Sequence, residues 1–261
     1  MVAVKKAFVK MHGAGNDFVM IDDRDGGFPV ENSGFIAGLA ARRTGIGAEG
    51  VILVQRSETA DFRMRFFNPD GGEAEMCGNG ARCVAMFARS IGAAGGEMRF
   101  ETAAGIVRAE ITGDYEVRIF LPPPKLLADD FIDSGVPHAI VPVDELSTVD
   151  VAAEGRRIRW SGRFAPAGTN VDFVKYFPPH RAEIRTYERG VEAESGACGT
   201  GAVAAAVAGV AAHSMSFPVE IGTSLGYTLT VDGKSDGAGG FTGISLTGPA
   251  EPVFEGCFSL P

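Results

Sequence analysis

The sequence predicts an α+β fold built from two duplicated halves, each a mostly antiparallel sheet wrapped round a central helix. The first observation is an internal repeat: residues 73–85 and 194–206 share six identities in thirteen aligned positions, with Cys77 and Cys198 in register. The second is that each cysteine opens a Cys-Gly-x-Gly-Ala motif followed by a helix-compatible run. The third is that strand-like segments surround both runs. We therefore expect a pseudo-twofold molecule with its active site in the cleft between the halves.

The first half is expected to span residues 1–120 and the second residues 121–251. The segment LPPPK at 121–125 is the candidate boundary, because three prolines stiffen the chain and cannot continue a strand ladder. Whether residues 252–261 return to the first half is left open. A weaker echo between 14–19 and 167–174 extends the duplication.

In the first half, a helix is expected over 35–43, where apolar residues recur with helical spacing until the glycines of 44–47 end them. The first copy of the repeat leads into a second helix over 82–89. Strands are expected at 6–11, 18–22, 50–54, 62–67, 98–102, 105–111 and 115–120.

In the second half, the repeat leads into a helix over 203–210. This run is apolar nearly all round, which predicts complete burial inside the surrounding sheet. Strands are expected at 131–133, 139–141, 157–160, 170–174, 183–187, 219–221, 227–231 and 243–247.

The bulk properties exclude several classes of protein. With 45% apolar and 22% charged residues, the chain has the composition of a globular protein, for which we expect a cytoplasmic location. The formal net charge of −9 argues against nucleic acid or an anionic membrane surface as a partner. No apolar run reaches membrane-spanning length, and the first residues do not form a signal peptide. The four cysteines lack the paired CxxC spacing of a structural zinc site, so no metal is expected.

Each repeated cysteine is expected at the start of a helix, where free backbone N–H groups and the helix dipole favour negative charge. We expect this position to lower the thiol pKa below its usual value of about 8.5. The glycines that follow leave room for a ligand anion, such as a carboxylate, to approach the N–H groups.

Two such thiols suit the inversion of an amino-acid Cα. If both helix ends hold the substrate carboxylate, a thiolate on one face removes the Cα proton and a thiol on the opposite face delivers one. The N–H groups stabilise the carbanion charge that spreads into the carboxylate. The scheme needs no cofactor: no Schiff-base lysine, metal or flavin takes part.

At these motifs, and along nearly its whole length, the chain resembles the diaminopimelate epimerase family. The resemblance implies a cofactor-independent enzyme that interconverts LL- and meso-diaminopimelate in lysine and peptidoglycan precursor biosynthesis, and it implies a homodimer. No single matching segment is specific, but the ordered set is. The segments are MHGAGNDF (11–18), GIGAEG (45–50), FNPDG (67–71), CGNGAR (77–82), GVPH (135–138), NV (170–171), YERG (187–190) and ACGTG (197–201).

The resemblance also implies a role for each candidate site residue. The two catalytic bases fall on Cys77 and Cys198. His138 falls at a position that tunes the ionisation of one thiol, and Glu188 at the position that serves the other. The substrate-binding positions fall on the backbone of Gly78, Asn79, Gly199 and Thr200, and on the side chains of Asn16, Asn68, Asn170, Glu188 and Arg189.

Glu188 and Arg189 make chemical sense independently of the resemblance. Diaminopimelate carries a second amino-acid head, whose carboxylate suits an Arg fork and whose ammonium suits a carboxylate. The chain departs from the family pattern at Val136, where many members have Asn, at Glu49, where Asp is usual, and at Ser195 with Gly196. These departures bear on substrate selectivity rather than on the chemistry at Cα.

Other functions remain open at the level of sequence. A racemase of another amino acid on the same fold is the nearest alternative, although the Glu188–Arg189 pair disfavours it. A thiol–disulfide redox protein is disfavoured by the missing CxxC arrangement. A phosphate-binding module is disfavoured because neither motif fits a P-loop or a dinucleotide-binding glycine pattern. Cys83 and Cys257 are expected to be structural.

Overall fold

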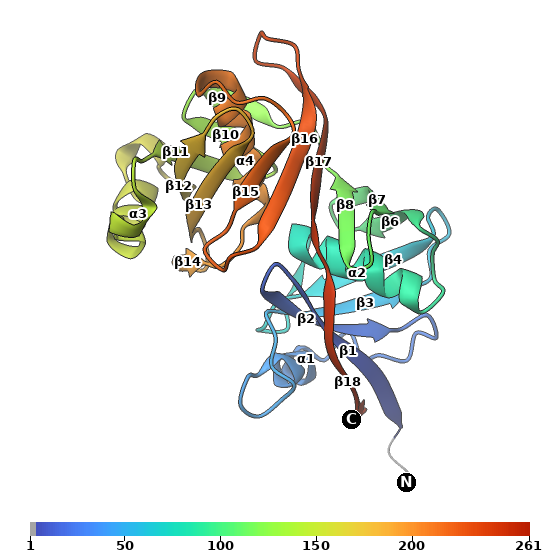
Figure 1. Cartoon of the computed structure of the whole chain (residues 1–261). Coiled ribbons are helices and arrows are strands. Elements are labelled where there is room, and N and C mark those ends of the chain that lie inside the picture. The colour runs from blue at the N-terminus through green and yellow to red at the C-terminus, as the bar shows by residue number, and fades with distance from the viewer. Residues whose placement is uncertain (1–3) are drawn as a thin grey trace. The chain divides into compact units, whose positions relative to one another are not determined.

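The computed structural model describes residues 4–261 and separates the chain into two compact units. The first unit runs to Ile119 and includes the C-terminal segment Pro249–Pro261, while the second is Phe120–Gly248. The C-terminal strand β18 (Glu251–Ser259) pairs antiparallel with the first strand, β1 (Lys5–Gly13), as Figure 1 shows in the first unit.

The first unit contains a mostly antiparallel sheet. Its further elements are β2 (Asn16–Asp22), α1 (Ser33–Ala40), β3 (Val51–Gln55), β4 (Phe62–Phe67), β5 (Glu73–Ala74), α2 (Gly78–Ser90), β6 (Glu97–Thr102), β7 (Gly105–Ile111) and β8 (Glu116–Phe120). The strands pair in the order β18–β1–β2–β3–β4–β6–β7, with the β2–β3 and β4–β6 pairs parallel.

The second unit has the same kind of sheet. Its elements are β9 (Lys125–Ala128), β10 (Phe131–Asp133), β11 (Pro137–Pro142), η1 (Leu146–Thr148), α3 (Val151–Arg159), η2 (Gly162–Phe164), β12 (Asn170–Phe177), β13 (Arg181–Glu188), β14 (Ala193–Ser195), α4 (Gly199–Ala212), β15 (Val219–Gly222), β16 (Thr228–Ser235) and β17 (Phe241–Pro249). The strands pair in the order β9–β10–β11–β12–β13–β15–β16–β17, with the β11–β12 and β13–β15 pairs parallel.

The two units repeat each other element by element, which confirms the predicted duplicated α+β fold. In both, a parallel strand pair is joined through a helix: β2–α1–β3 in one unit and β11–α3–β12 in the other. In both, two antiparallel pairs then lead into the central helix, β3–β4–β5–α2 and β12–β13–β14–α4. A strand parallel to β4 or β13 follows.

This topology corrects the weaker echo between 14–19 and 167–174. The echo aligns β2 with β12, but β12 is parallel to the strand before it and antiparallel to the strand after it. In the first unit β3 has this pattern, because it is parallel to β2 before it and antiparallel to β4 after it. Strand β2, by contrast, is antiparallel to the strand before it, β1. The short likeness between the two segments is therefore not part of the structural repeat.

Both central helices are enclosed by their own sheets, as predicted. Helix α2 contacts β1, β2, β3 and β7, and α4 contacts β10, β11, β12, β13, β15 and β16. Every residue from Asn79 to Ala88 and from Gly201 to Gly209 is buried. Because both stretches are buried on all sides, packing inside the sheet rather than exposure of a polar face to water stabilises each helix.

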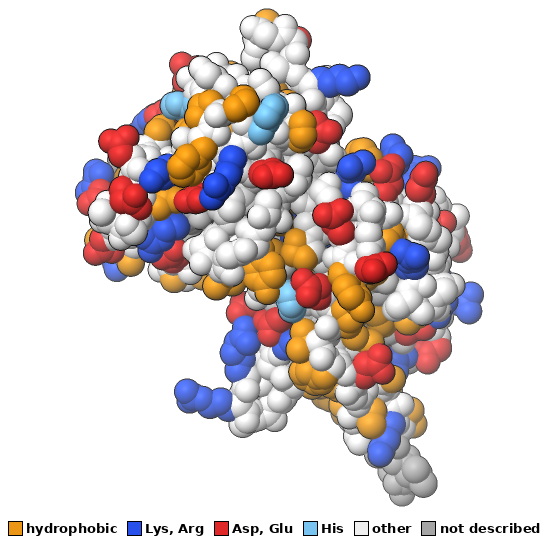
Figure 2. Space-filling view, viewed as in Figure 1, with side chains coloured by type: hydrophobic (Ala, Val, Ile, Leu, Met, Phe, Trp, Pro, Cys, Tyr) orange, Lys and Arg blue, Asp and Glu red, His pale blue; other side chains and the backbone are white. Residues whose placement is uncertain are grey.

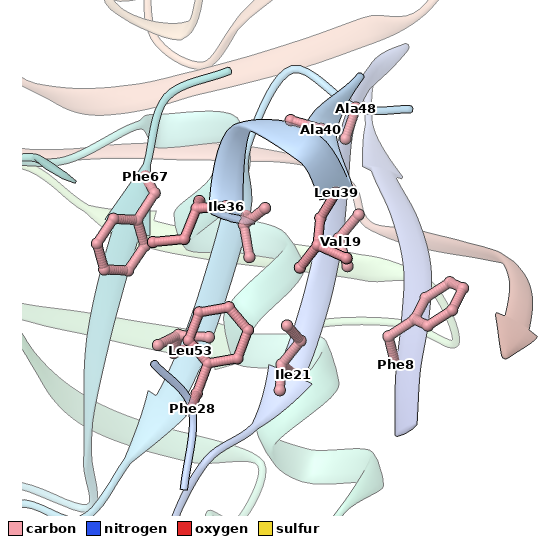
Figure 3. Packing of buried hydrophobic residues seen from close by; sticks show 11 residues of the cluster. Phe8, Val19, Ile21, Phe28, Ile36, Leu39, Ala40, Ala48, Leu53 and Phe67 are labelled. Atoms are coloured by element: carbon pink, nitrogen blue, oxygen red, sulfur yellow. The ribbon is translucent and has the colours of Figure 1, made fainter. Parts of the chain in front are cut away.

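Helix α1 covers the outer face of the first sheet. Its side chains Ile36 and Leu39 pack on Val19 and Ile21 of β2 and on Phe28 (Figure 3). Each of these side chains is at least nine-tenths buried, and burying one of them contributes roughly 1.5–3 kcal/mol. Because side chains alternate along a strand, the intervening residues of β2 face the other side of the sheet, where α2 packs.

The strand expected at 157–160 is wrong, because most of this segment is the last turn of α3. The Asp150 side chain caps the helix by accepting a hydrogen bond from the Ala153 N–H at 3.0 Å. Arg157 forms an ion pair with Glu154 one turn earlier at 2.7 Å. Ile158 packs on the cluster that contains Val151. The alternation of charged and apolar residues resembled a half-buried strand, but the capped helix buries the same apolar side chain.

Several smaller differences have local causes. Helix α1 lies at Ser33–Ala40 rather than 35–43, because the Asn32 side chain accepts from the Phe35 N–H and so starts the helix earlier. Strands β5, β9 and β14 are too short to show an alternating pattern in the sequence. In β18 a proline and a glycine interrupt the pattern.

One face of the molecule can be compared with the expectation that the protein does not bind nucleic acid. On the face drawn in Figure 2, acidic and basic side chains are interspersed, with no broad basic area. No helix among residues 4–261 is long and apolar enough to span a membrane.

Candidate active site

Cys77 lies at the N-cap position of α2, in extended conformation with φ −135° and ψ 124°. Its carbonyl accepts the first helical hydrogen bond, from the Ala81 N–H at 2.7 Å. A Cβ on Gly80 would lie 2.8 Å from Ile52 Cδ1, so this glycine permits the helix start to pack on β3. A Cβ on Gly78 would meet only Ile119 Cδ1, at 3.9 Å. In the first turn, space beside the half-buried sulfur is therefore found at Gly78, whereas Gly80 is packed against β3.

A completely buried arginine lies one turn after Cys77. Arg82 Nη2 donates to Asn79 Oδ1 at 2.8 Å, and the other guanidinium nitrogens reach the carbonyls of Gly78 at 3.5 Å and Pro249 at 3.4 Å. Within residues 4–261 no carboxylate forms an ion pair with it. Burial lowers the pKa of Arg82, while the thiols of Cys83 and Cys77 counteract the shift. Arg82 was predicted only as part of the motif. An arginine within a largely apolar helix could have indicated a buried polar position.

The other cysteine of α2 is inert by position. Cys83 is completely buried, and burial raises the pKa of its thiol to about 12, with Arg82 opposing the rise. A thiol protonated at neutral pH and closed to solvent is a poor nucleophile. This environment fits the structural role expected for Cys83. Cys257 of β18 is exposed.

Asn16 and Asn68 lie in the same unit as Cys77. Asn16 begins β2, and its side-chain oxygen Oδ1 is buried without a hydrogen-bond partner among the described residues. A buried acceptor left unsatisfied is costly, and ligands commonly complete such groups. Asn68 follows β4 and closes a turn: its N–H donates to the Gly72 carbonyl at 2.8 Å, and its carbonyl accepts from the Gly71 N–H at 2.9 Å. Its half-buried side chain is not needed to form this turn.

Cys198 occupies the equivalent N-cap position of α4, with its neighbours Gly199 and Thr200 in the first turn. Its Sγ accepts from the Gly201 N–H at 3.4 Å and lies 3.4 Å from Thr200 Oγ1. Burial raises the pKa of the Cys198 thiol, and the carboxylates of Glu188 and Asp172 add to the rise. The hydrogen bonds with Thr200 and Gly201 oppose it without reversing it.

The expectation of a lowered thiol pKa is therefore wrong for Cys198. A helix N-terminus favours a thiolate by a modest amount, which falls off within the first turn. Desolvation and two nearby carboxylates outweigh that effect here. The prediction rested on the helix end alone, whereas the pKa of Cys198 also depends on its burial and on the carboxylates of Glu188 and Asp172.

His138 on β11 is completely buried beside this helix start. Its Nε2 lies 3.0 Å from Thr200 Oγ1, and its Nδ1 lies 2.6 Å from Asp172 Oδ2. The carboxylate of Asp172 also accepts from the Thr186 hydroxyl at 2.7 Å. A histidine that only capped a turn would not form a hydrogen bond with Thr200 in the first turn of α4. Asp172 is not among the predicted site residues. An acidic residue within the apolar strand segment 170–174 could have indicated a buried polar position.

Asn170 and Arg189 meet at the ends of β12 and β13. The Asn170 amide oxygen accepts from the Arg189 backbone N–H at 2.7 Å, and its Nδ2 lies 3.3 Å from His138 Nε2. Among the described residues of the second unit, the half-buried Arg189 side chain donates to one acceptor, the Gly168 carbonyl, at 3.5 Å. Glu188 is half-buried at the last position of β13.

The structure thus groups the predicted residues within each unit. In the second unit, Cys198, Thr200, His138 and Asn170 form one hydrogen-bonded group that continues through Asn170 to the backbone of Arg189. In the first unit, Cys77, Gly78 and Asn79 form the start of α2. No group of three or more acidic, cysteine or histidine side chains with metal-binding geometry occurs in the part of the chain that the structure describes.

Solved structures with this architecture define the class of the fold. A phenazine biosynthesis protein of the PhzF family from Bacillus anthracis superimposes with a TM-score of 0.75 at 16% identity, covering 98% of this chain and 100% of that one. A hydroxyproline epimerase from Agrobacterium vitis superimposes with a TM-score of 0.66 at 16% identity, covering 98% and 93%. The chain is therefore an α+β protein of the duplicated fold that these structures share.

Sequence relatives are more specific. The family described as Diaminopimelate epimerase matches residues 8–126 and 131–253. The diaminopimelate epimerase of Aquifex aeolicus is 42% identical, covering 97% of this chain and 97% of the relative. That of Chlorobaculum tepidum is also 42% identical, covering 96% and 100%. The chain belongs to the diaminopimelate epimerase family and is accordingly an isomerase.

Proposed function

We propose that the protein interconverts LL- and meso-diaminopimelate by cofactor-independent proton transfer at Cα, with Cys77 and Cys198 as the two bases. The observation that carries the proposal is the duplicated cysteine at the N-cap position of each central helix, followed in both units by a Gly-x-Gly first turn. The family membership supplies the substrate.

The reaction needs one base on each face of the substrate carbon. A thiolate takes the Cα proton and becomes a thiol, the Cα electron pair spreads into the adjacent carboxylate, and the second thiol gives its proton to the opposite face. The second sulfur ends as a thiolate, so the reverse reaction exchanges the roles. A single base would tend to return the proton to the face that it left, so the proposal requires both sulfurs to reach one Cα.

The first turns of α2 and α4 are suited to hold the reacting carboxylate. Gly78 and Asn79 begin one helix, and Gly199 and Thr200 begin the other. N–H groups at a helix start lack an intrahelical acceptor and bind anions. When charge builds on the carboxylate oxygens, donors that are already oriented lower the barrier without reorganising.

The distal head of the substrate is assigned to Glu188 and Arg189, and the side chains of Asn16, Asn68 and Asn170 are assigned to the substrate site as well. A guanidinium binds a carboxylate through paired hydrogen bonds, and a carboxylate binds an ammonium. The unsatisfied Oδ1 of Asn16 and the loosely held side chain of Arg189 support this assignment, since each has bonding capacity left for a ligand.

The two sulfurs have different charged neighbours. The buried Arg82 guanidinium interacts with the Cys77 thiol, and this interaction opposes the lowering of the Arg82 pKa by burial. Around Cys198 burial and two carboxylates raise the pKa of the thiol, so it remains protonated at neutral pH. We infer that Cys77 is the base and Cys198 the acid in the resting enzyme.

The test is proton exchange in D2O with LL-diaminopimelate, followed by NMR and by chiral separation of the products. We expect the Cα–H signal to disappear as the meso isomer forms, with no added pyridoxal phosphate or metal. Loss of activity after exhaustive chelation or carbonyl-reagent treatment would contradict the cofactor-free scheme. Comparable turnover of lysine or histidine would instead place the protein among broader amino-acid racemases.

We also infer a cytoplasmic homodimer from the family membership. Light scattering of the purified protein tests the oligomeric state, and a single monomeric species at working concentration would contradict the inference. Cell fractionation tests the location.

A further inference from the structure

A line of buried polar groups leads from Cys198 into the interior of the second unit. It runs from Sγ to Thr200 Oγ1 at 3.4 Å, then to His138 Nε2 at 3.0 Å, and from His138 Nδ1 to Asp172 Oδ2 at 2.6 Å. Asp172 and His138 are both 0% exposed. A Cβ on Gly201 would lie 2.7 Å from Asp172 Oδ1. The absence of a side chain at this glycine therefore leaves room for the carboxylate against the first turn of α4.

Asp172 fixes the direction in which protons point along this line. A carboxylate can only accept, so the ring proton of a neutral imidazole lies on His138 Nδ1, and Nε2 is an acceptor. Asn170 agrees with this arrangement, because its Oδ1 accepts from the Arg189 backbone N–H at 2.7 Å and its Nδ2 faces the Pro137 carbonyl and His138 Nε2, each at 3.3 Å. The Thr200 hydroxyl then donates to Nε2 and is free to accept the proton of the Cys198 thiol.

We propose that Asp172 is a positioning residue that makes His138 the proton acceptor for Cys198, with the Thr200 hydroxyl carrying the proton. The S–H bond of Cys198 breaks as its proton passes to Thr200 Oγ1, and the hydroxyl proton of Thr200 passes to His138 Nε2. The products are a thiolate, an intact hydroxyl and an imidazolium paired with the Asp172 carboxylate, so total charge is unchanged. The inference rests on the proposed function, because it states how Cys198 becomes the base for one direction of epimerisation.

Asp172 acts on Cys198 in two opposite ways, and this makes the proposal testable. Directly, its negative charge repels a thiolate and raises the pKa of Cys198. Through His138, it stabilises the imidazolium that forms when Cys198 ionises. The strand neighbours of His138 carry no charge, since β10 places Ile132 opposite it and β12 places Asn170 opposite it. Of the other charged groups, Glu188 acts on the Cys198 sulfur and raises its pKa.

The experiment measures alkylation of Cys198 by iodoacetamide across the neutral and alkaline range, by mass spectrometry, without substrate. Asp172→Asn keeps an oxygen that accepts from His138 Nδ1–H but removes the charge. We expect its Cys198 alkylation rate at neutral pH to fall at least about tenfold, with a higher pH midpoint. Cys77 in the same sample is the internal control and should keep its rate. A lower midpoint in Asp172→Asn would mean that Asp172 is only a nearby charge and would overturn the proposal.

A matched pair at Thr200 decides the matter even if Asp172→Asn does not fold. Thr200→Val keeps the side-chain shape and removes the hydroxyl, so Cys198 alkylation should fall at least about tenfold, whereas Thr200→Ser should retain the rate. Equal rates for the Val and Ser variants would contradict the proton path. Since neither measurement needs substrate, these results stand or fall separately from the epimerase activity itself.

Discussion

At the scale of single residues, Cys77 and Cys198 have equivalent backbone positions and different neighbours. Each precedes a glycine that starts the central helix. In the aligned repeat, however, buried Arg82 stands where the second copy has Val203, and Asn79 stands where it has Thr200. The duplication therefore kept the cysteine and the two glycines of the motif and changed the electrostatic surroundings. The two thiols are expected to react differently, although the proposed scheme gives each of them the role of base in one direction.

Replacement of either repeated cysteine by serine should nearly abolish epimerisation, because inversion needs a base on both faces and a hydroxyl is a much weaker acid than a thiol. Cys83→Ser and Cys257→Ser should retain activity, and they are the matched controls. Formation of meso-diaminopimelate from the LL isomer in D2O measures all four variants. Near-normal turnover by Cys198→Ser would exclude the two-base scheme. A single-site variant should still eliminate a leaving group from a β-halogenated substrate analogue, which needs one base.

Arg189→Ala tests the distal half of the substrate site. A charged hydrogen bond contributes roughly 1.5–3 kcal/mol, and the substrate carboxylate would be left unpaired as well, so kcat/KM for diaminopimelate should fall at least about a hundredfold. The rates of thiol alkylation should not change. Arg181→Ala is the control, since this exposed arginine pairs with Glu183 on the surface at 2.6 Å. Equal kinetic losses in the two variants would remove Arg189 from the site.

At the scale of elements, two helical glycines predict opposite outcomes for the same substitution. Gly201→Ala should slow Cys198 alkylation and lower the melting temperature, because the new Cβ would lie 2.7 Å from the buried Asp172 Oδ1 and 3.3 Å from Cys198 Cβ. Gly38→Ala in α1 meets nothing within 4 Å and should stabilise that helix by up to about 1 kcal/mol. Thermal unfolding measures both. Stabilisation by Gly201→Ala would show that the first turn of α4 is not constrained by the carboxylate.

The elements also show what sequence patterns can and cannot predict. The central helices and most strands were predictable, because apolar runs and alternation are local features of the chain. Helix α3 was not, because the pattern at 157–160 satisfies both a strand and a helix, and the choice depends on the Asp150 cap and on packing against β12 and β13. The candidate site follows the same rule. The cysteines and glycines of the repeat were visible in the sequence, whereas Asp172 gains its importance from a hydrogen bond across two strands.

At the scale of the whole molecule, the duplication gives one chain two equivalent cysteines, which is what the proposed two-base scheme requires. Each unit builds the same sequence of pairings around its own helix, so each presents a cysteine by the same local means. The echo that sequence comparison placed on β2 and β12 failed because outside the motif the units share topology rather than residues. Only the cysteine motif, residues 73–85 and 194–206, retained enough identities to be recognised in the sequence.

Oxidation tests whether the two sulfurs share one substrate carbon. If both reach a single Cα, they should also come within disulfide range, which needs cysteine Cα atoms about 4.4–6.8 Å apart, and mild oxidation should then inactivate the enzyme reversibly. Mass spectrometry should find Cys77 linked to Cys198, and bound substrate analogue should slow the reaction. Cys83 should not take part, because it is closed to solvent and burial raises its pKa to about 12. Cys257→Ser is the control that removes links between exposed cysteines of different molecules. A Cys77–Cys83 bond in place of Cys77–Cys198 would mean that the two repeated thiols do not serve one carbon.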